Sequence, residues 1–214
     1  MHQSGDPVCA SEPRARCEVV SRTSRSASGT LCRVQNISWT VIADDDRDLD
    51  PAVLEDAGDL CHLAFGPGFT SHDWAHTFGG QRLVVTDRSR VVGHTAVVPR
   101  SIRIGNQLLR VGYVEGVAVA PSLQGQGIGT LLMRATNDVV RLRYDVGVLS
   151  TGRHAFYERL GWERWEGPSY VQNGSRLART PDEDAGIMVL RTPLTPCIDL
   201  RSEITCQARE GDDW

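Results

Sequence analysis

The sequence predicts a fold that combines helices and strands (α/β in the broad sense, of the α+β class). Its sheet is expected to be mixed but mostly antiparallel, splayed at a bulged central strand and flanked by about four helices. A valine-rich strand, a glycine-rich loop and an amphipathic helix follow one another over residues 113–143. Two strands with short turns, 82–87 and 91–104, precede this unit and indicate an antiparallel meander. An apolar strand, 144–150, follows it. A connection as long as a helix implies that this strand pairs parallel to the central one.

The elements before the meander are a strand and two helices. The strand covers residues 39–43. The first helix begins at Pro51, directly after Asp50, whose side chain is suited to cap it. The segment 69–78 predicts a second, shorter helix.

The central strand and its helix carry the most informative pattern. Gly116 interrupts the valine-rich strand 113–120, and a glycine at such a position indicates a bulge or a close backbone approach to a ligand. The loop 124–129 then opens a helix whose apolar side chains recur at helical spacing, which predicts one buried face. These side chains are Ile128, Leu131, Leu132, Ala135, Val139 and Leu142.

The last part of the chain alternates short elements with loops. A final helix over 154–160 is followed by a strand at 162–165 and an irregular region as far as Asp184. A strand at 186–191 follows, and the tail is expected to add one more strand over 198–204.

Composition limits the domain organisation and the partners. Residues 1–36 are rich in Ser and Arg and lack any periodicity, so we expect a disordered N-terminal extension and one domain over 37–214. The formal net charge of −4 indicates neither nucleic acid nor an anionic membrane as partner, and no apolar run is long enough for a membrane span. The six cysteines lack zinc-site spacing, so we expect mostly free thiols in a reducing, cytoplasmic compartment.

The glycine-rich loop is suited to a phosphate group. Glycines at the start of a helix let the backbone approach a bulky anion, and the N–H groups of the first turn favour negative charge. The spacing is neither the dinucleotide fingerprint nor a P-loop. We therefore expect the loop to hold a pyrophosphate. The alternative is a plain strand-to-helix turn without a ligand.

Several segments resemble one enzyme family. The pattern Gln124-x-x-Gly127-x-Gly129 after a bulged strand resembles the acetyl-CoA motif of the GNAT superfamily of N-acetyltransferases, and AFYERLGW at 155–162 resembles a late motif of that superfamily. Four segments are similar, in order, to aminoglycoside 2′-N-acetyltransferases: HDWAHTFGG, VGYVEGVAV, RTPDED and the final GDDW. The resemblance implies the GNAT fold, acetyl-CoA as acyl donor, and acetyl transfer to the 2′-amino group of aminoglycosides, which confers antibiotic resistance.

Acetyl transfer requires a neutral amine, so a base must take a proton from the sugar ammonium group. Glu115, beside the bulge, is the candidate base, and the resemblance implies that it acts through a bound water. The alternative is a strand carboxylate turned to solvent. Backbone N–H groups near Val117 are candidates for binding the oxyanion. The resemblance makes Tyr157 the general acid, although its ring could simply pack in the core and the segment from Ser150 is shorter than in that family.

The resemblance also implies two sets of binding residues. The donor set is Val117, Ala118, Val119, Gln124, Gly125, Gln126, Gly127, Ile128 and Gly129. The acceptor set is Asp73, Glu115, Gly116, Ser150, Asp182, Glu183, Asp212 and Trp214. Its carboxylates suit an acceptor that carries several positive charges. His72 and His76 lie four residues apart, but no further ligands are evident, so no metal is expected.

The sequence does not decide which amine is the acetyl acceptor. Where the family has an acidic residue in Gly-Asp-Phe, this chain has Gly68, so a narrower acceptor such as kasugamycin is an alternative. Another small-molecule amine or a protein amine is a further alternative within the same fold. A non-catalytic module that binds acetyl-CoA or an antibiotic is an alternative of another class. The resemblance also implies a homodimer.

Overall fold

Two long strands, β3 (Arg90–Ile104) and β4 (Gln107–Val119), form the middle of the sheet. The computed structural model describes residues 39–45 and 49–214, and the predicted extension over 1–36 lies outside them. The other strands are β1 (Trp39–Asp45), β2 (Gln81–Asp87), β5 (Val146–Ser150), β6 (Glu163–Arg164), β7 (Ser169–Asn173), β8 (Arg176–Arg179), β9 (Ile187–Arg191) and β10 (Ile204–Gln207).

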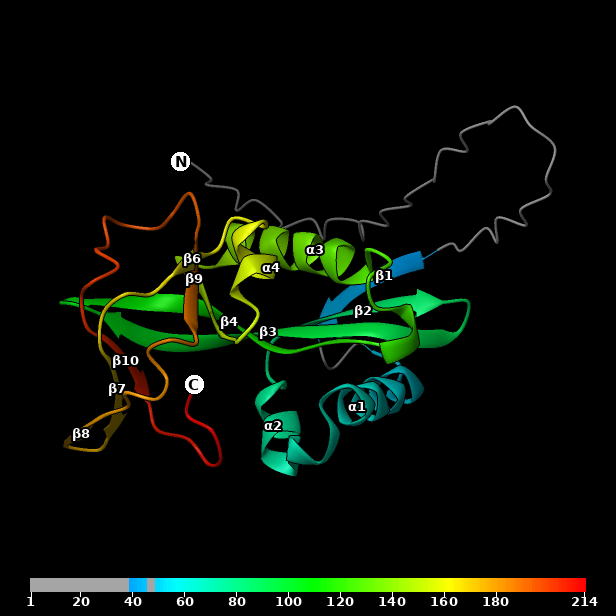
Figure 1. Ribbon diagram of the computed structural model, residues 1–214, viewed down its shortest axis with the longest axis horizontal. Helices are drawn as coiled ribbons and strands as arrows, with labels where there is room; N and C mark the ends of the chain where they lie inside the picture. The colour runs from blue at the N-terminus through cyan, green and yellow to red at the C-terminus, as the bar shows by residue number, and fades with distance from the viewer. Residues whose placement is uncertain (1–38, 46–48) are drawn as a thin grey trace, which may run out of the picture.

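The strands form a single curved sheet with helices on both faces. Its order is β6-β9-β5-β4-β3-β10-β7-β8, and β2 and β1 continue from the first half of β3. The helices are α1 (Pro51–Phe65), α2 (Ser71–His76), α3 (Ile128–Arg143) and α4 (His154–Glu158), with short 3-10 turns η1 (Gly66–Gly68) and η2 (Pro121–Leu123). Figure 1 shows α3 and α4 on one side of the sheet and α1 and α2 on the other.

The two N-terminal helices begin where the sequence provides caps. The Asp50 carboxylate accepts a hydrogen bond of 2.9 Å from the N–H of Ala52, and Pro51 occupies the first helical position of α1. In α2, Thr70 and Asp73 form a capping box, in which each side chain accepts from the backbone N–H of the other. The predicted starts of both helices are therefore confirmed to within two residues.

The predicted bulge in β4 is confirmed. Between the paired residues His94 and Ala118 and the pair Ala96 and Glu115, β3 has one residue and β4 has two, Gly116 and Val117. Gly116 adopts a φ of 60°, which is a conformation that residues with a Cβ rarely adopt. The extra residue bends β4 and breaks the regular hydrogen-bond ladder at this point.

The predicted parallel pairing of β4 with β5 is also confirmed, but it is short. Only Val111 to Tyr113 of β4 pair with Val146 to Val148 of β5. Beyond Tyr113 the two strands diverge, which leaves this edge of β4, on either side of the bulge, without a strand neighbour in the described part of the chain. The sheet is therefore splayed where the bulge lies.

The buried face of α3 differs from the prediction. Its buried residues are Ile128, Leu132, Met133, Thr136, Asn137 and Val140. Leu142 is 79% exposed, so its assignment to the buried face was wrong. This face includes two polar residues, whose side chains are satisfied by hydrogen bonds inside the core. Thr136 donates to the carbonyl of Leu132 (2.9 Å), and Asn137 donates to the Leu160 carbonyl (2.9 Å) and accepts from the Trp162 indole (3.0 Å). A search for apolar spacing alone cannot find such positions.

Two predictions for the last part of the chain were wrong. The region before Asp184 is not irregular, because β7 and β8 form an antiparallel hairpin that turns at Gly174. Its strands are short and polar, so they lack an alternating apolar pattern. The tail strand begins only at Ile204, since the chain turns over Asp199 to Ser202 before β10 inserts between β3 and β7.

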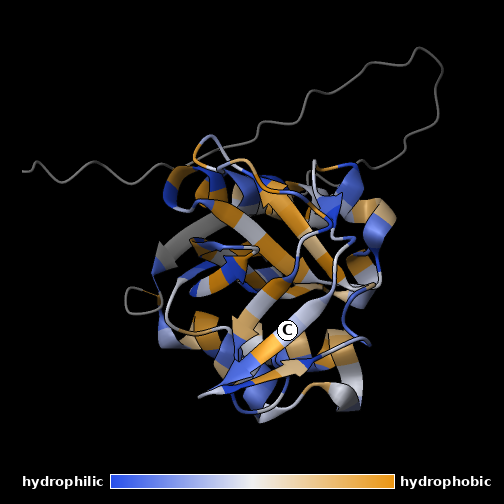
Figure 2. Ribbon diagram, turned by 90° about the vertical axis from the view of Figure 1, so that its left-hand side faces the viewer, coloured by the Kyte–Doolittle hydropathy of each residue, from blue (hydrophilic) through white to orange (hydrophobic). Residues whose placement is uncertain are grey.

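The core is divided between two hydrophobic clusters. One joins α1 and α3 to β2, β3 and β4, and the other lies among β4, β5, β7, β9 and β10 and includes Trp165 and Trp214. Figure 2 shows the apolar residues concentrated on the strands that cross the interior, with hydrophilic residues on the outer loops. Trp214 therefore fastens the C-terminal tail to the second cluster.

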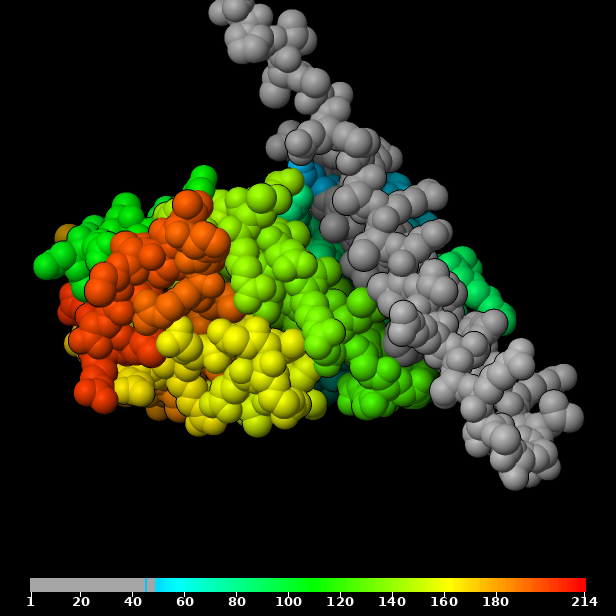
Figure 3. Space-filling model, turned by 90° about the horizontal axis from the view of Figure 1, so that it is seen from above, coloured from blue at the N-terminus to red at the C-terminus, as the bar shows by residue number. Residues whose placement is uncertain are grey.

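The face above the sheet is covered by segments from the second half of the chain. Figure 3 shows α3 beside the segment that contains α4, with the stretch after β9 next to both. The hydrogen bonds of Asn137 to Leu160 and Trp162, and of Thr192 to the Tyr144 carbonyl, join these three segments. The segment that follows α4 is thus held against α3.

Three of the six cysteines lie in the described part of the chain. Cys61, Cys197 and Cys206 are free thiols, as predicted, and the other three fall within residues 1–38. Among the described residues no helix combines the length and the hydropathy that crossing a membrane requires.

We expect Gly116→Ala to destabilise the fold. The new methyl group would lie 3.1 Å from both the His94 ring and the Thr77 side chain, in a backbone conformation unfavourable to alanine. The free energy of unfolding, measured by urea denaturation, should fall by about 1–3 kcal/mol. Gly68→Ala is the control, because Gly68 lacks both the positive φ and any atom within 4 Å of an added Cβ. Equal stabilities of the two variants would contradict the expected strain at Gly116.

Candidate functional site

Two cavities meet at the bulge of β4. The glycine-loop cavity, of about 560 Å³, is lined by β4, the loop after η2, the first turn of α3 and α4. The Glu115 cavity, of about 360 Å³, is lined by β4, β5, the loop after β5 and Trp214. Phe65, Val117, Arg153 and Tyr157 line both cavities. A long molecule in the first cavity can therefore present one end to a second molecule in the other.

The glycine loop has the geometry of an anion site. Gly125 and Gly127 have φ values of 77° and 92°, and no atom lies within 4 Å of where a Cβ would stand. Gly127 is the N-cap of α3, and no side chain of the described residues caps that helix. The first-turn N–H groups and the positive end of the helix dipole therefore face the cavity without a built-in acceptor, as a phosphate site requires.

Most predicted donor-binding residues line the glycine-loop cavity. They are Val117, Ala118, Val119, Gln124, Gly125, Gly127 and Gly129. The two exceptions are Gln126, which is exposed and donates to the Ser122 carbonyl (3.5 Å), and Ile128, whose side chain is buried in the core. Ile128 can thus offer a ligand only its backbone N–H.

The sequence interpretation missed two arginines beside this cavity. Arg153 and Arg159, at the two ends of α4, line it together with Phe156. Their positive charges suit the phosphates of a nucleotide in this cavity. The only sequence signal was one arginine just before the AFYERLGW motif and one within it.

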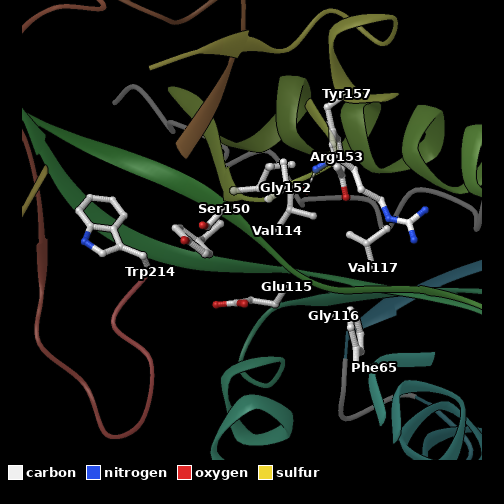
Figure 4. Close-up of a pocket in the computed structure, with 13 residues that line it drawn as sticks. Phe65, Val114, Glu115, Gly116, Val117, Ser150, Gly152, Arg153, Tyr157 and Trp214 are labelled. Atoms are coloured by element: carbon white, nitrogen blue, oxygen red, sulfur yellow. Dashed lines mark hydrogen bonds between the residues drawn. The ribbon is translucent and has the colours of Figure 1, made fainter. Parts of the chain in front are cut away.

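The Glu115 cavity brings together residues from four distant segments. Glu115, Gly116, Ser150, Tyr157 and Trp214 line it. Figure 4 shows the Glu115 carboxylate on the side of β4 toward Trp214 and Ser150, with Val117 and Arg153 on the other side. The Tyr157 ring descends from α4 toward β4. The candidate base and the candidate acid therefore approach the bulge from different elements.

Glu115 does not face open solvent, which contradicts the alternative interpretation of a solvated strand carboxylate. Its side chain is 15% exposed, and one carboxylate oxygen accepts a hydrogen bond of 2.7 Å from Nη1 of Arg209. Burial raises the pKa of Glu115 above its ordinary value, and the Arg209 guanidinium opposes that rise. The outcome is a carboxylate with a raised pKa, as suits a general base.

Arg209 is a site residue that the sequence interpretation missed. Its Nε donates to the Asp212 carbonyl (2.6 Å), its backbone N–H donates to the Asp213 carboxylate (2.8 Å), and its guanidinium lies 5.6 Å from the centre of the Tyr113 ring. These contacts hold the C-terminal tail against β4. The pairing with Glu115 spans 94 residues, so no local pattern could have indicated it.

Three predicted acceptor-binding carboxylates lie outside the cavity lining but close to one another. Burial raises the pKa of Glu183, and Asp212 and Asp182 raise it further. Asp212 also raises the pKa of Glu115. Because such effects require proximity, these acids form one acidic region, and Asp212 is the member that influences Glu115. A polycation would relieve the repulsion among them.

Asp73 has a structural contact that the sequence did not predict. Its carboxylate accepts hydrogen bonds from the Thr70 N–H (2.6 Å) and hydroxyl (2.8 Å) at the start of α2. Burial acts to raise the pKa of Asp73, but the hydrogen bonds from Thr70 and the nearby positive charges together outweigh it, so the pKa is lowered. Arg209 also lowers this pKa, which places Asp73 near the tail.

Tyr157 combines a packing contact with access to both cavities. Its ring meets Phe156 and Trp162 edge to face, with centroids 5.0 and 6.1 Å away. Burial raises the pKa of its hydroxyl to about 12, and Arg153 opposes that rise. The shorter connection from Ser150 therefore still brings this tyrosine to the junction of the cavities.

Both histidines of α2 contact Glu210 in the C-terminal tail. His76 Nε2 lies 2.7 Å from the Glu210 carbonyl, and His72 lies 3.9 Å from the Glu210 carboxylate. Within residues 39–45 and 49–214, no group of three potential metal ligands is close enough to hold an ion.

Comparison with known proteins points to one family. A family model described as an acetyltransferase (GNAT) domain matches residues 47–165. The curated aminoglycoside 2′-N-acetyltransferase of Mycolicibacterium fortuitum is 38% identical over 171 residues, which cover 78% of this chain and 88% of the relative.

Solved structures have the same fold. A GNAT family N-acetyltransferase from Escherichia coli in complex with CoA has a TM-score of 0.60 at 17% identity, covering 80% of this chain and 91% of that one. A GNAT family acetyltransferase from Brucella melitensis in complex with acetyl-CoA has a TM-score of 0.51 at 20% identity, covering 74% and 93%. By its family match and its curated relative, this chain belongs to the GNAT superfamily and, within it, to the aminoglycoside 2′-N-acetyltransferases.

Proposed function

We propose that this protein transfers an acetyl group from acetyl-CoA to the 2′-amino group of aminoglycoside antibiotics and thereby confers resistance to them. The observation that carries the proposal is the junction of the two cavities at Val117 and Tyr157. One cavity has an uncapped helix N-terminus for a pyrophosphate, and the other has a buried carboxylate beside an acidic region. The name of the Mycolicibacterium fortuitum relative supports the same acceptor and the same regiochemistry.

The donor would lie along β4 in the glycine-loop cavity. Backbone N–H groups at Gly125 to Gly129 would bind its pyrophosphate, and Arg153 and Arg159 would neutralise its remaining charge. The unpaired edge of β4 beyond Tyr113 would bind the amide groups of the pantetheine arm. This arrangement brings the thioester to Val117, where the two cavities join.

Glu115 would remove a proton from the incoming ammonium group, through a water if direct contact is too distant. Burial favours this role, because it makes the carboxylate a stronger base than one in solvent. General base catalysis of this kind typically contributes about 10²- to 10⁴-fold. The N–H of Val117 would bind the oxyanion, and Tyr157 would protonate the departing thiolate.

Attraction between carboxylates of the protein and ammonium groups of the antibiotic would bind the acceptor. Asp182, Glu183 and Asp212 form the acidic region beside Glu115, and each could pair with an ammonium group of the antibiotic. Ser150 and the backbone of Gly116 would supply neutral hydrogen-bonding groups at the cavity wall. Asp73 would contribute at the α2 side, close to Arg209.

The experiment that tests the proposal is a thiol-release assay with acetyl-CoA and a panel of acceptors. The panel should include deoxystreptamine aminoglycosides, kasugamycin and a lysine peptide, with NMR of each product to locate the acetyl group. Acetylation at the 2′-nitrogen of aminoglycosides is the expected result. Turnover of kasugamycin or the peptide alone would establish one of the other acceptors, and acetyl-CoA binding without thiol release would establish a non-catalytic module.

Replacement of Arg209 should change the pH dependence of the reaction. Arg209→Ala removes the cation that holds down the pKa of Glu115, so that pKa should rise further. A base works only when ionised, so the acidic limb of the kcat/KM profile should move to higher pH. The control is Arg201→Ala, which removes an exposed arginine paired with Glu166 (2.9 Å). An acidic limb that stays in place would contradict the assignment of Glu115 as base.

Replacement of Tyr157 should separate its two roles. Tyr157→Phe keeps the ring against Phe156 and Trp162 but removes the proton donor, so kcat should fall by about 10²-fold or more with little change in the melting temperature. Tyr144→Phe removes the hydroxyl of another buried tyrosine, one that lines neither cavity, and should leave kcat unchanged. Loss of stability with kcat preserved in Tyr157→Phe would show that the residue only packs.

Gly68 should influence the acceptor range. It is exposed in η1 with open space around it, so an added side chain meets no obstacle. Gly68→Asp should lower KM for deoxystreptamine aminoglycosides by up to about five-fold, as an exposed ion pair allows. Gly68→Asn has the same shape without the charge and should leave KM unchanged. Equal KM values for wild type and Gly68→Asp would refute this role.

Two further predictions accompany the proposal. A cytoplasmic location fits free Cys61, Cys197 and Cys206 and a donor that cells hold in the cytoplasm. A homodimer is expected from the family, and sedimentation of the purified protein would test it.

A further inference from the structure

A buried histidine connects the bulge of β4 to a buried arginine. The ring of His94, on β3, is fully buried, with Nδ1 2.7 Å from the carbonyl oxygen of Gly116. Its other nitrogen, Nε2, lies 2.6 Å from Nη1 of Arg82, which is also fully buried. Neither residue lines the two cavities, so neither can touch a substrate directly.

The contacts determine where the proton of His94 lies. Arg82 can only donate, so Nε2 must be the acceptor and Nδ1 must carry the hydrogen. Nδ1–H then donates to the Gly116 carbonyl. Burial, with the nearby Arg82 charge, lowers the pKa of His94 to about 3, so the ring stays neutral at working pH. One hydrogen-bonded chain thus runs from Arg82 through His94 to the backbone of the bulge.

Arg82 is itself firmly held. Its guanidinium lies 4.8 Å from the Trp74 ring and 4.7 Å from the Phe78 ring, and it donates to the hydroxyl (3.1 Å) and the carbonyl (3.0 Å) of Thr77. The His94 ring therefore rests on a fixed support from α2 and the segment that follows it.

The Gly116 carbonyl and the Val117 N–H belong to one peptide group. In a planar trans peptide these two bonds point in opposite directions. Because the carbonyl points toward His94 on β3, the N–H points away from β3, to the edge of β4 from which β5 has diverged. That edge faces the junction of the two cavities, where Val117 lies.

The remaining neighbour of the histidine does not offer an alternative role. Cys61 Sγ lies 3.3 Å from Nδ1 and 3.9 Å from the Gly116 oxygen. Burial raises the pKa of this thiol to about 12, so it stays protonated and is no nucleophile. The arrangement of Cys61 and His94 is thus part of the support beneath the bulge rather than a second reactive centre.

We infer that His94 is a positioning residue, which, through its hydrogen bond to the Gly116 carbonyl, aims the Val117 N–H at the oxygen of the donor's thioester. The inference rests on the proposed acetyl transfer, since it concerns the group that binds the oxyanion in that reaction. Without the histidine, the peptide at the flexible Gly116 is free to rotate and the N–H loses its fixed direction. An N–H donor held in place before the reaction stabilises the transition state more than one that must reorient.

Two variants of His94 test this positioning role, and they differ in where they place a hydrogen-bond donor. His94→Asn puts its amide N–H near the position of Nδ1, where it can still donate to Gly116. His94→Gln reaches the position of Nε2, beside Arg82, and offers nothing to Gly116 without a shift. Thr136→Val is the control, because it removes another buried hydrogen bond to a backbone carbonyl, between two residues that line neither cavity.

Two readouts are needed. Steady-state kinetics with the best aminoglycoside should show kcat reduced by about 10²-fold in His94→Gln, with KM little changed, and at least ten-fold recovery in His94→Asn. Infrared spectroscopy of bound, ¹³C-labelled acetyl-CoA needs no acceptor. Its thioester carbonyl stretch should lie at lower frequency in wild type and His94→Asn than in His94→Gln, because the N–H hydrogen bond weakens that bond.

The two readouts distinguish failure of the proposed aminoglycoside acceptor from failure of the positioning role of His94. The wild-type protein could lower the frequency of the thioester carbonyl stretch relative to His94→Gln and yet acetylate no aminoglycoside. That result would refute the proposed acceptor and leave the positioning role of His94 supported. Equal carbonyl frequencies and equal kcat values for the Asn and Gln variants, with folding verified by near-ultraviolet circular dichroism, would overturn the positioning role. A change of kcat in Thr136→Val as large as in His94→Gln would also overturn it, since any buried hydrogen bond would then have the same effect.

Discussion

One extra residue in β4 is the feature on which the rest of the site depends. The pair Gly116 and Val117 faces a single residue of β3, and from that mismatch the strand bends and separates from β5. The separation opens the space in which the two cavities meet. The same mismatch turns one peptide group out of the ladder, so a backbone N–H becomes available for chemistry. A regular strand would have closed the sheet and used every such group for pairing.

Charge is arranged in two opposed regions around this point. On the donor side, Arg153, Arg159 and the N-terminus of α3 are positive. On the acceptor side, Glu115, Glu183 and Asp212 are negative, and Arg209 partly compensates them. Under the proposed function, an anionic donor and a cationic acceptor would be attracted to different cavities before they meet. In the protein without substrate, the Arg209 guanidinium occupies the partner position on Glu115 that an ammonium group of the acceptor could otherwise take.

The sequence revealed the local patterns of the fold and missed the long-range ones. The bulge at Gly116 and the loop before α3 depend on neighbouring residues, and both were predictable. The parallel pairing of β5 was predictable because a connection as long as a helix implies it. The β7–β8 hairpin was missed because its strands are polar, and the buried face of α3 was misjudged because Thr136 and Asn137 are satisfied inside the core. Arg209 and His94 form hydrogen bonds with Glu115 and Gly116, which are remote in sequence, and no spacing rule can identify such pairs. Glu115 and Tyr157 could be named as candidates because they lie within recognisable segments, and both line the Glu115 cavity.

The thiol of Cys61 has a practical consequence. It lies on the buried face of α1, within 4 Å of both His94 and Gly116, whereas Cys197 is exposed. An alkylating reagent can reach Cys61 only when α1 separates from the sheet, so its labelling rate reports how often that layer opens. Cys197 would react at once and calibrate the reagent. The chain thus contains its own probe for the dynamics of the layer beneath the reaction centre, without any engineered label.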